Sequence, residues 1–158
     1  MSVAPPTPIE VFISYSHNDE ELKRELTKHL SLLNREHLIS EWHDRDITAG
    51  TEWRLEIDRH LNTARLILIL VSPDYMASEY CYGIEMTRAL QRHYNGSAVV
   101  IPIILRPVDW HSAPFAKLQA LPTDAQPITT WVNQDVAFAN TALGIRNAIE
   151  LLNANSRA

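Results

Sequence analysis

Leu66-Ile67-Leu68-Ile69-Leu70-Val71 is an unbroken apolar run near the middle of the sequence, and it decides the fold. A strand with one face in water alternates polar and apolar residues, whereas a strand buried on both faces carries apolar residues at every position. Strands of the second kind lie at the centre of parallel sheets that helices cover on both sides. The run therefore predicts the central strand of an α/β domain.

Strands and helices alternate on both sides of this run. β-Branched and aromatic residues predict further strands over 9–15, 38–42, 99–105 and 127–131, the last of them a weak edge strand. Apolar residues at helical spacing predict helices over 22–33, 53–61, 73–93 and 138–152. Pro102 suggests limited pairing or a bulge in its strand. The alternation predicts a flavodoxin-like five-stranded parallel sheet of order 2-1-3-4-5 with helices on both faces.

The length and composition indicate the domain organisation. A chain of 158 residues corresponds to about one domain, and we expect an extended leader over 1–8, the folded domain over 9–152 and a polar tail or linker over 153–158. Cys81 is the single cysteine, which excludes an intramolecular disulfide and favours a reducing compartment. No secretory signal is recognisable, and no apolar run approaches the roughly 20 residues that span a bilayer. The sequence thus predicts a cytoplasmic protein without a membrane segment.

Charge and motifs exclude several functional classes. Lys and Arg number 14 against 19 Asp and Glu, and a net charge of −5 provides no basic surface for nucleic acid. The four glycines form neither of the Gly-rich phosphate-binding motifs. The seven histidines lack the spacing of a metal site, so we expect no metal ion. A phosphorelay receiver would need acidic residues where Ser14 and Ser72 stand.

The candidate positions for a ligand follow from the fold, because doubly wound sheets bind ligands at the carboxyl ends of their strands. These positions are Ser14–His17, Asp44–Gly50 and the helix that begins after Ser72. In that helix, the helical wheel places Glu85 beside a buried stripe. The stripe is expected to comprise Ala77, Tyr80, Cys81 and Ile84. Glu85 is then either a site carboxylate at the border of the core or a partly exposed glutamate paired with a neighbouring arginine.

Four motifs occur in order along the chain. They are Val11-Phe12-Ile13-Ser14-Tyr15-Ser16, Asp44-Arg45-Asp46-Ile47-x-x-Gly50-x-x-Trp53, Leu70-Val71-Ser72-Pro73-x-Tyr75 and Cys81-x-x-x-Glu85. Their order and spacing resemble those of Toll/interleukin-1 receptor (TIR) domains of the bacterial type. The resemblance covers roughly residues 9–152 and implies the same flavodoxin-like sheet.

The resemblance implies two possible functions. Some TIR domains cleave NAD at the bond between nicotinamide and ribose, releasing nicotinamide with ADP-ribose or a cyclic ADP-ribose isomer, and bacterial members act in immune signalling and antiphage defence. Others are scaffolds that act through TIR–TIR contacts. The catalytic members carry a glutamate in a Trp-Cys-x-x-Glu pattern that matches Glu85, with Cys81 and Tyr82 in place of the tryptophan and the cysteine. Glu85 therefore implies an NADase, and the non-catalytic scaffold is the alternative.

The resemblance also implies a set of contact residues, with NAD as the substrate and no cofactor. The implied substrate-binding residues are Tyr15, Ser16, Asp44, Trp53, Cys81 and Tyr82. Tyr80 or Tyr82 could supply the aromatic stacking of the missing tryptophan, and Trp53 is alternatively a core residue of its helix. An assembly contact with a neighbouring TIR domain is implied for Asp44, Arg45, Asp46, Ile47 and Gly50. A sensor domain or subunit is the implied activator.

Overall fold

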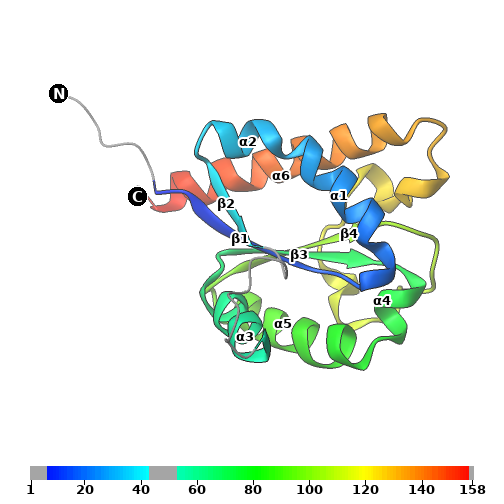
Figure 1. The fold of residues 1–158 in the computed structure, drawn as a ribbon, viewed down its shortest axis with the longest axis horizontal. Helices are drawn as coiled ribbons and strands as arrows, with labels where there is room; N and C mark the ends of the chain where they lie inside the picture. Colours follow the sequence, from blue (N-terminus) through cyan, green and yellow to red (C-terminus); the bar gives the residue numbers. More distant parts are fainter. Residues whose placement is uncertain (1–6, 43–52, 157–158) are drawn as a thin grey trace.

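The computed structural model describes residues 7–42 and 53–156 of the chain. The sheet in these ranges contains four strands, β1 (Ile9–Ser14), β2 (Ile39–Trp42), β3 (Leu66–Val71) and β4 (Val99–Ile104). They are parallel and lie in the order β2-β1-β3-β4 (Figure 1). β3 lies between β1 and β4. The predicted central position of the apolar run and the order of the first four strands are thus confirmed.

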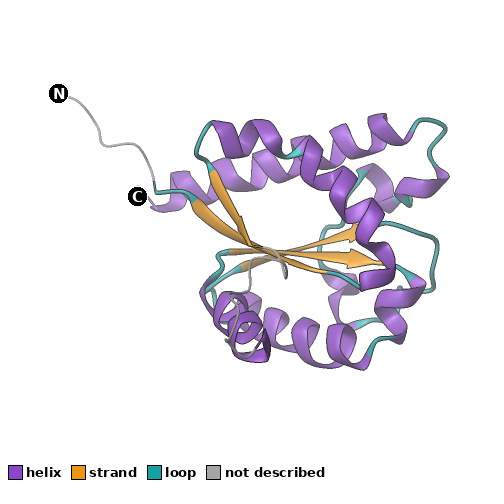
Figure 2. Cartoon of the chain, in the orientation of Figure 1, coloured by secondary structure: helices purple, strands orange, loops and turns teal. Residues whose placement is uncertain are grey.

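Helices cover both faces of the sheet (Figure 2). One face carries α1 (Glu20–His29), α2 (Ser31–Arg35) and α6 (Gln134–Ser156). The opposite face carries α3 (Trp53–Thr63), α4 (Pro73–Ala77) and α5 (Met86–Tyr94). The last turn of α6 includes residues 153–156, which the sequence assigns to the polar tail. None of the helices in the described ranges has the length and hydropathy that crossing a bilayer requires.

The side chains of β3 divide between two apolar cores. Its three leucines join the core formed with α1 and α6, whereas its two isoleucines and Val71 join the core formed with α3 and α5. All of them are fully buried. Side chains alternate between the faces of a strand, and the same rule directs Phe12 and Ser14 of β1 to the side of α3, α4 and α5.

The predicted fifth strand over 127–131 is wrong. Residues Ile128–Thr130 form a 3-10 helix, η6. The backbone N–H and the hydroxyl of Thr130 both donate to the carbonyl oxygen of Pro127, at 2.9 and 2.7 Å. Threonine side chains that bond to a nearby carbonyl compete with sheet pairing, and proline brings no donor to a ladder. These local bonds close a turn instead of extending a strand.

The ladder between β3 and β4 passes through Pro102 without a bulge, because Ile69 pairs with Pro102 in an unbroken register. On the other side of β4, the carbonyl oxygen of Pro102 accepts from Leu121 N at 2.9 Å. The prolyl nitrogen faces this outer side as well, where a missing donor disturbs no continuous ladder. Leu121 adds only an isolated parallel bridge to Ile103. The expected bulge is therefore wrong, and the limited pairing is found on the outer side.

The helix predicted without interruption over 73–93 consists of three segments, α4, the π-helix η3 (Glu79–Glu85) and α5. Ser78 ends α4 with an extended backbone at φ −83° and ψ 120°. Its hydroxyl accepts from Cys81 N at 3.0 Å and caps the next segment. Met86 N then donates to the carbonyl oxygen of Cys81, five residues earlier, which is the π-helical pattern. This break was not predicted, because the apolar residues keep a helical spacing on both sides of Ser78. The spacing gives no sign that Ser78 ends one helix and caps the next.

The helix predicted over 22–33 is also divided. The 3-10 turn η1 (His17–Asp19) precedes α1, and Leu30 separates α1 from α2. The leucines at 26, 30 and 33 are nevertheless buried, as their spacing predicts. The irregular stretch after β4 contains the 3-10 turns η4 (Pro114–Lys117) and η5 (Thr123–Ala125).

Candidate functional site

A cavity of about 250 Å³ opens at the carboxyl end of β1. It is lined by residues from the turn after β1, from α3 and from the segment that precedes α5, namely Tyr15, Ser16, His17, Asn18, Ile57, Ser78, Tyr80, Cys81 and Glu85. A larger groove of about 480 Å³ between β4 and α6 has no acidic side chain in its described lining. The smaller cavity lies at the sheet edge where ligands of doubly wound folds bind. It is the candidate site.

Glu85 is the carboxylate of this cavity, and only 5% of it is exposed. The alternative of a partly exposed surface glutamate is therefore wrong. The π-helix accounts for the difference, because its wider turns rotate the later residues relative to an α-helical wheel. Ile84, predicted to be buried, is exposed, while Met86 is buried next to Glu85. Ala77, also predicted to be buried, is exposed at the end of α4, before the π-helix begins.

Ser14 and Tyr75 contact Glu85 from two other elements. Ser14 Oγ donates to Glu85 Oε1 at 2.6 Å, and it lies 2.9 Å from the hydroxyl of Tyr75. All three residues are buried. Ser14 reaches this position because β1 presents its even-numbered side chains to the face that α3, α4 and α5 cover. A buried carboxylate thus receives a hydrogen bond from the central sheet.

The pKa of Tyr75 reflects this environment. Burial raises the pKa of the phenol well above 10, and the negative charge of Glu85 raises it further. The hydrogen bond with Ser14 opposes these effects but does not outweigh them. Tyr75 is consequently a neutral phenol at physiological pH.

The cavity brings together three of the predicted substrate-binding residues, Tyr15, Ser16 and Cys81. The Cys81 thiol donates to the carbonyl oxygen of Tyr15 at 3.3 Å, which ties the π-helix to the end of β1. The Tyr15 hydroxyl donates to Glu20 at 2.5 Å, and the ammonium of the buried Lys23 lies 5.2 Å from the Tyr15 ring centre.

Tyr80, and not the predicted Tyr82, is the tyrosine of the π-helix that lines the cavity. Ile57 lines it from α3, one helical turn after Trp53. The side chain of Trp53 lies outside the description, as do Asp44 and the predicted assembly residues Arg45, Asp46, Ile47 and Gly50. In the described ranges, no group of three or more His, Cys, Asp and Glu side chains could hold a metal ion.

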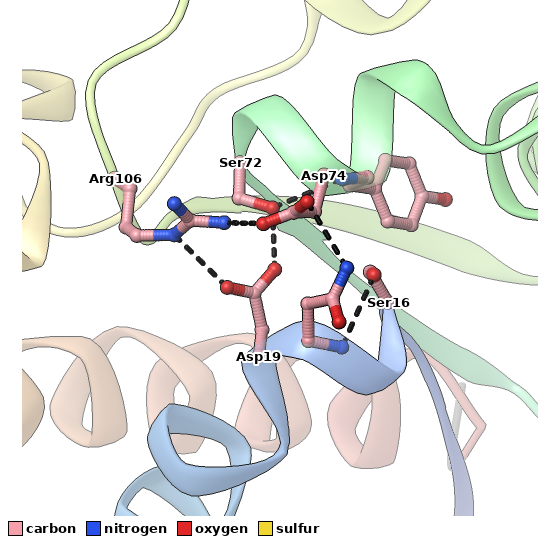
Figure 3. Close-up of polar contacts among 7 residues, drawn as sticks. Ser16, Asp19, Ser72, Asp74 and Arg106 are labelled. Atoms are coloured by element: carbon pink, nitrogen blue, oxygen red, sulfur yellow. Dashed lines mark hydrogen bonds and ion pairs between the residues drawn. The ribbon is translucent and has the colours of Figure 1, made fainter.

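An ionic cluster lies beside the cavity at the carboxyl ends of β1, β3 and β4 (Figure 3). Arg106 Nε donates to Asp19 Oδ1 at 2.9 Å, and Arg106 also donates to Asp74. The Ser72 hydroxyl donates to the other oxygen of Asp19. Asn18 Nδ2 donates to Asp74 at 3.1 Å. Arg106 therefore ties together the turns that follow two other strands.

The charges of this cluster support one another. Asp19 has a side chain that is 1% exposed, so its carboxylate depends on a partner for its stability. Burial disfavours the charged form of Arg106, yet its hydrogen bonds with Asp74 and Asp19 and their negative charges raise its pKa above the ordinary value. None of the motifs in the sequence points to Arg106 as a member of this cluster. A charged residue directly after a buried strand was the available signal.

The cluster fixes one wall of the cavity. Asp19 ends the short turn η1, whose cap Ser16 accepts from Asn18 N at 3.3 Å. Ser16 and Asn18 both line the cavity. On the other side, the Ser72 hydroxyl accepts from Tyr75 N at 3.0 Å and caps α4. The cluster thus holds both the lining turn and the helix that carries Tyr75.

Comparison with known proteins agrees with this architecture. A family profile described as TIR domain matches residues 11–139. The "Uncharacterized protein y4lF" of Sinorhizobium fredii (strain NBRC 101917 / NGR234) is 55% identical over 138 residues, which make up 87% of this chain and 43% of that protein. The chain therefore spans less than half the length of this curated relative.

A solved structure shows the same fold. The crystal structure of the TIR domain of the Toll-related receptor TRR-2 from Hydra magnipapillata superimposes with a TM-score of 0.59 at 22% identity, over 89% of this chain and 97% of that one. The structure defines an α/β domain with a buried carboxylate at the carboxyl edge of its parallel sheet. The chain belongs to the TIR-domain family.

We predict that Arg106→Met lowers the free energy of unfolding by about 3 kcal/mol, because it leaves the buried Asp19 carboxylate without its cation. Urea unfolding measures the loss. Arg146→Met is the matched control, since Arg146 pairs with Glu36 in water-exposed surroundings and such pairs contribute little to stability. Equal losses in the two variants would contradict the structural role of the cluster.

A second prediction concerns alkaline pH. Because the pKa of Tyr75 is raised in the folded state, the unfolded chain releases this proton first, from about pH 10 upward. Folding stability should then fall by up to about 1.4 kcal/mol for each further pH unit. Tyr75→Phe should remove this component, whereas Tyr94→Phe, at an exposed position, should retain it. Urea unfolding at pH 8 and pH 11 makes the comparison, and identical pH dependence in all three proteins would contradict it.

Proposed function

We propose that the chain cleaves the bond between nicotinamide and ribose in NAD, with Glu85 as the catalytic carboxylate. The observation that carries the proposal is the buried carboxylate of Glu85 in a cavity at the carboxyl edge of the sheet. The products are nicotinamide and either ADP-ribose or a cyclic ADP-ribose isomer. Membership of a family that includes NADases supports the assignment.

The chemistry requires a fixed negative charge. As nicotinamide leaves, positive charge develops on the ribose, as it does in the oxocarbenium-like transition states of glycoside hydrolysis. A carboxylate held in position stabilises that charge. Nicotinamide leaves as a neutral molecule from a cationic precursor, so no general acid is needed. One carboxylate can therefore perform a task for which glycosidases use two.

The dimensions of the cavity suggest which part of NAD enters it. Pockets for drug-sized ligands measure about 300 to 1,000 Å³, so a cavity of about 250 Å³ suits the nicotinamide riboside half of a dinucleotide. We propose that Ser16 and Cys81 contact this half together with Tyr15, and that Tyr80 offers an aromatic face. Asp44, Trp53 and Tyr82 remain proposed substrate contacts on the basis of the motif resemblance alone.

We also propose that the domain self-associates through Asp44, Arg45, Asp46, Ile47 and Gly50, in bacterial immune signalling. These residues lie outside the described ranges, and the proposal depends on the family, in which TIR–TIR contacts are typical. The same contacts are the basis of the alternative function, a scaffold without catalysis. The two functions differ in whether Glu85 is needed for turnover of NAD.

The decisive test is Glu85→Gln. It should reduce nicotinamide release from NAD by about a hundredfold or more, because it removes a charge used in the transition state. Chromatography of the reaction products measures the release, and an unchanged melting temperature shows that the fold is retained. Glu79→Gln, at an exposed position of the same π-helix, is the matched control and should keep wild-type turnover.

The result separates the two functions. Release that is equal in wild type and Glu85→Gln would overturn the catalytic assignment. Absence of NAD cleavage in both, with self-association intact, would favour the scaffold.

Self-association leads to a further prediction. If a neighbouring copy completes the site, turnover per molecule should rise with protein concentration, and a head-to-tail contact permits open assemblies. Gly50→Pro should suppress the rise, because proline restricts the backbone of the contact loop. NAD turnover and light scattering over a concentration series test this expectation. A constant specific activity in a monomeric protein would show that one copy holds a complete site.

A further inference from the structure

We propose that Tyr75 and Ser14 are positioning residues, which hold Oε1 of Glu85 through a hydrogen-bond chain that runs from the phenol to the hydroxyl to the carboxylate. The catalytic part of this inference depends on the proposed NADase function. The chain joins three separate elements, α4, β1 and the π-helix η3.

The direction of the chain follows from counting hydrogens. An ionised carboxylate only accepts hydrogen bonds, so the single hydrogen of the Ser14 hydroxyl lies on the 2.6 Å contact with Glu85 Oε1. Ser14 Oγ must then accept in its 2.9 Å contact with Tyr75. The phenol of Tyr75 is therefore the donor, which agrees with its neutral form at physiological pH. Both bonds point toward the negative charge.

Burial makes the chain effective. Ser14 is 1% exposed, Tyr75 is not exposed, and Glu85 is 5% exposed. Hydrogen bonds in such surroundings are stronger than in water, and donors in series polarise one another. A charged acceptor strengthens the bond it receives. The chain thus fixes the orientation of a carboxylate whose placement determines the stabilisation of the ribose cation.

The anchor of the chain is rigid. Tyr75 belongs to the first turn of α4, whose cap Ser72 bonds to the buried Asp19 of the ionic cluster. Ser14 belongs to β1, which is paired on both sides by β2 and β3. Neither side chain therefore has to be ordered when substrate binds.

Loss of either hydroxyl should have a characteristic effect. Hydrogen bonds to the charged form of an acid lower its pKa, so removing them raises the pKa of Glu85. The other titratable groups of the same cavity are Tyr15, His17, Tyr80 and Cys81. These four residues are the same in Ser14→Ala and Tyr75→Phe as in the wild type. A shift of the Glu85 titration therefore reports on the loss of the hydrogen-bond chain.

The experiment compares Ser14→Ala, Tyr75→Phe and the double variant with the wild type, and uses Tyr94→Phe as the control for an exposed phenol. Both single variants should lower kcat for NAD about tenfold or more, with little change of KM. The acid limb of the pH profile should move to higher pH. Because Tyr75 acts through Ser14, the double variant should be no slower than Ser14→Ala. Additive losses of kcat in the double variant, or an acid limb that does not move, would overturn the proposed hydrogen-bond chain.

A second measurement needs no turnover. The carboxyl carbon of Glu85, assigned with Glu85→Gln, is titrated by ¹³C NMR in the wild type and the variants. A higher pKa in Ser14→Ala and Tyr75→Phe than in Tyr94→Phe supports the chain, and equal values overturn it. If Glu85→Gln abolishes NAD cleavage while Ser14→Ala and Tyr75→Phe keep the wild-type kcat and the wild-type pKa of Glu85, the proposed function is supported and the positioning role of Ser14 and Tyr75 is overturned. If the wild type does not cleave NAD but the titration shifts, the proposed function falls.

Discussion

The removal of β3 from water on both faces is the constraint on which the rest of the structure depends. Its six side chains are apolar and fully buried, so helices must cover each face before the next parallel strand begins. The connections then place the residues that follow β1, β3 and β4 at one edge. Polar groups that the core cannot accept collect there, among them Asp19, Ser72 and Arg106. The position of the site thus follows from the construction of the core.

At this edge, the first turn of α4 connects two polar networks. Ser72 donates to Asp19 and accepts from the backbone of Tyr75, while the side chain of Tyr75 reaches Ser14 and, through it, Glu85. The ionic cluster therefore does more than neutralise a buried acid. It holds α4, from which Tyr75 contacts Ser14 and, through it, Glu85, and it holds the turn that lines the cavity. Stability and site geometry depend on the same few contacts.

The sequence predicted what depends on local pattern. Hydrophobic periodicity identified β3, the neighbouring strands β1 and β4, and the buried leucine of α1. It succeeds there because whether a residue is buried decides whether that position is apolar. It failed where hydrogen bonds decide the backbone, as at Thr130, which closes a turn in place of a fifth strand, and at Ser78, which caps a new helix. It placed Glu85 near the core but missed Arg106, since contacts that span 87 residues leave no mark in the spacing of residues.

The structure contains two buried acids at one sheet edge, and their partners distinguish their roles. Asp19 faces a guanidinium, whose opposite charge cancels most of the field that the carboxylate would exert on a ligand. Glu85 receives a hydrogen bond from a neutral hydroxyl, which orients the carboxylate without cancelling its charge. The hydrogen bond from Ser14 thus leaves the charge of Glu85 in place, as its proposed role toward a ribose cation requires. That hydroxyl is itself held by the neutral phenol of Tyr75, so neither Ser14 nor Tyr75 brings a positive charge to Glu85. The two buried acids therefore differ in their described contacts: Arg106 and Ser72 contact Asp19, whereas Ser14 contacts Glu85, the proposed catalytic carboxylate.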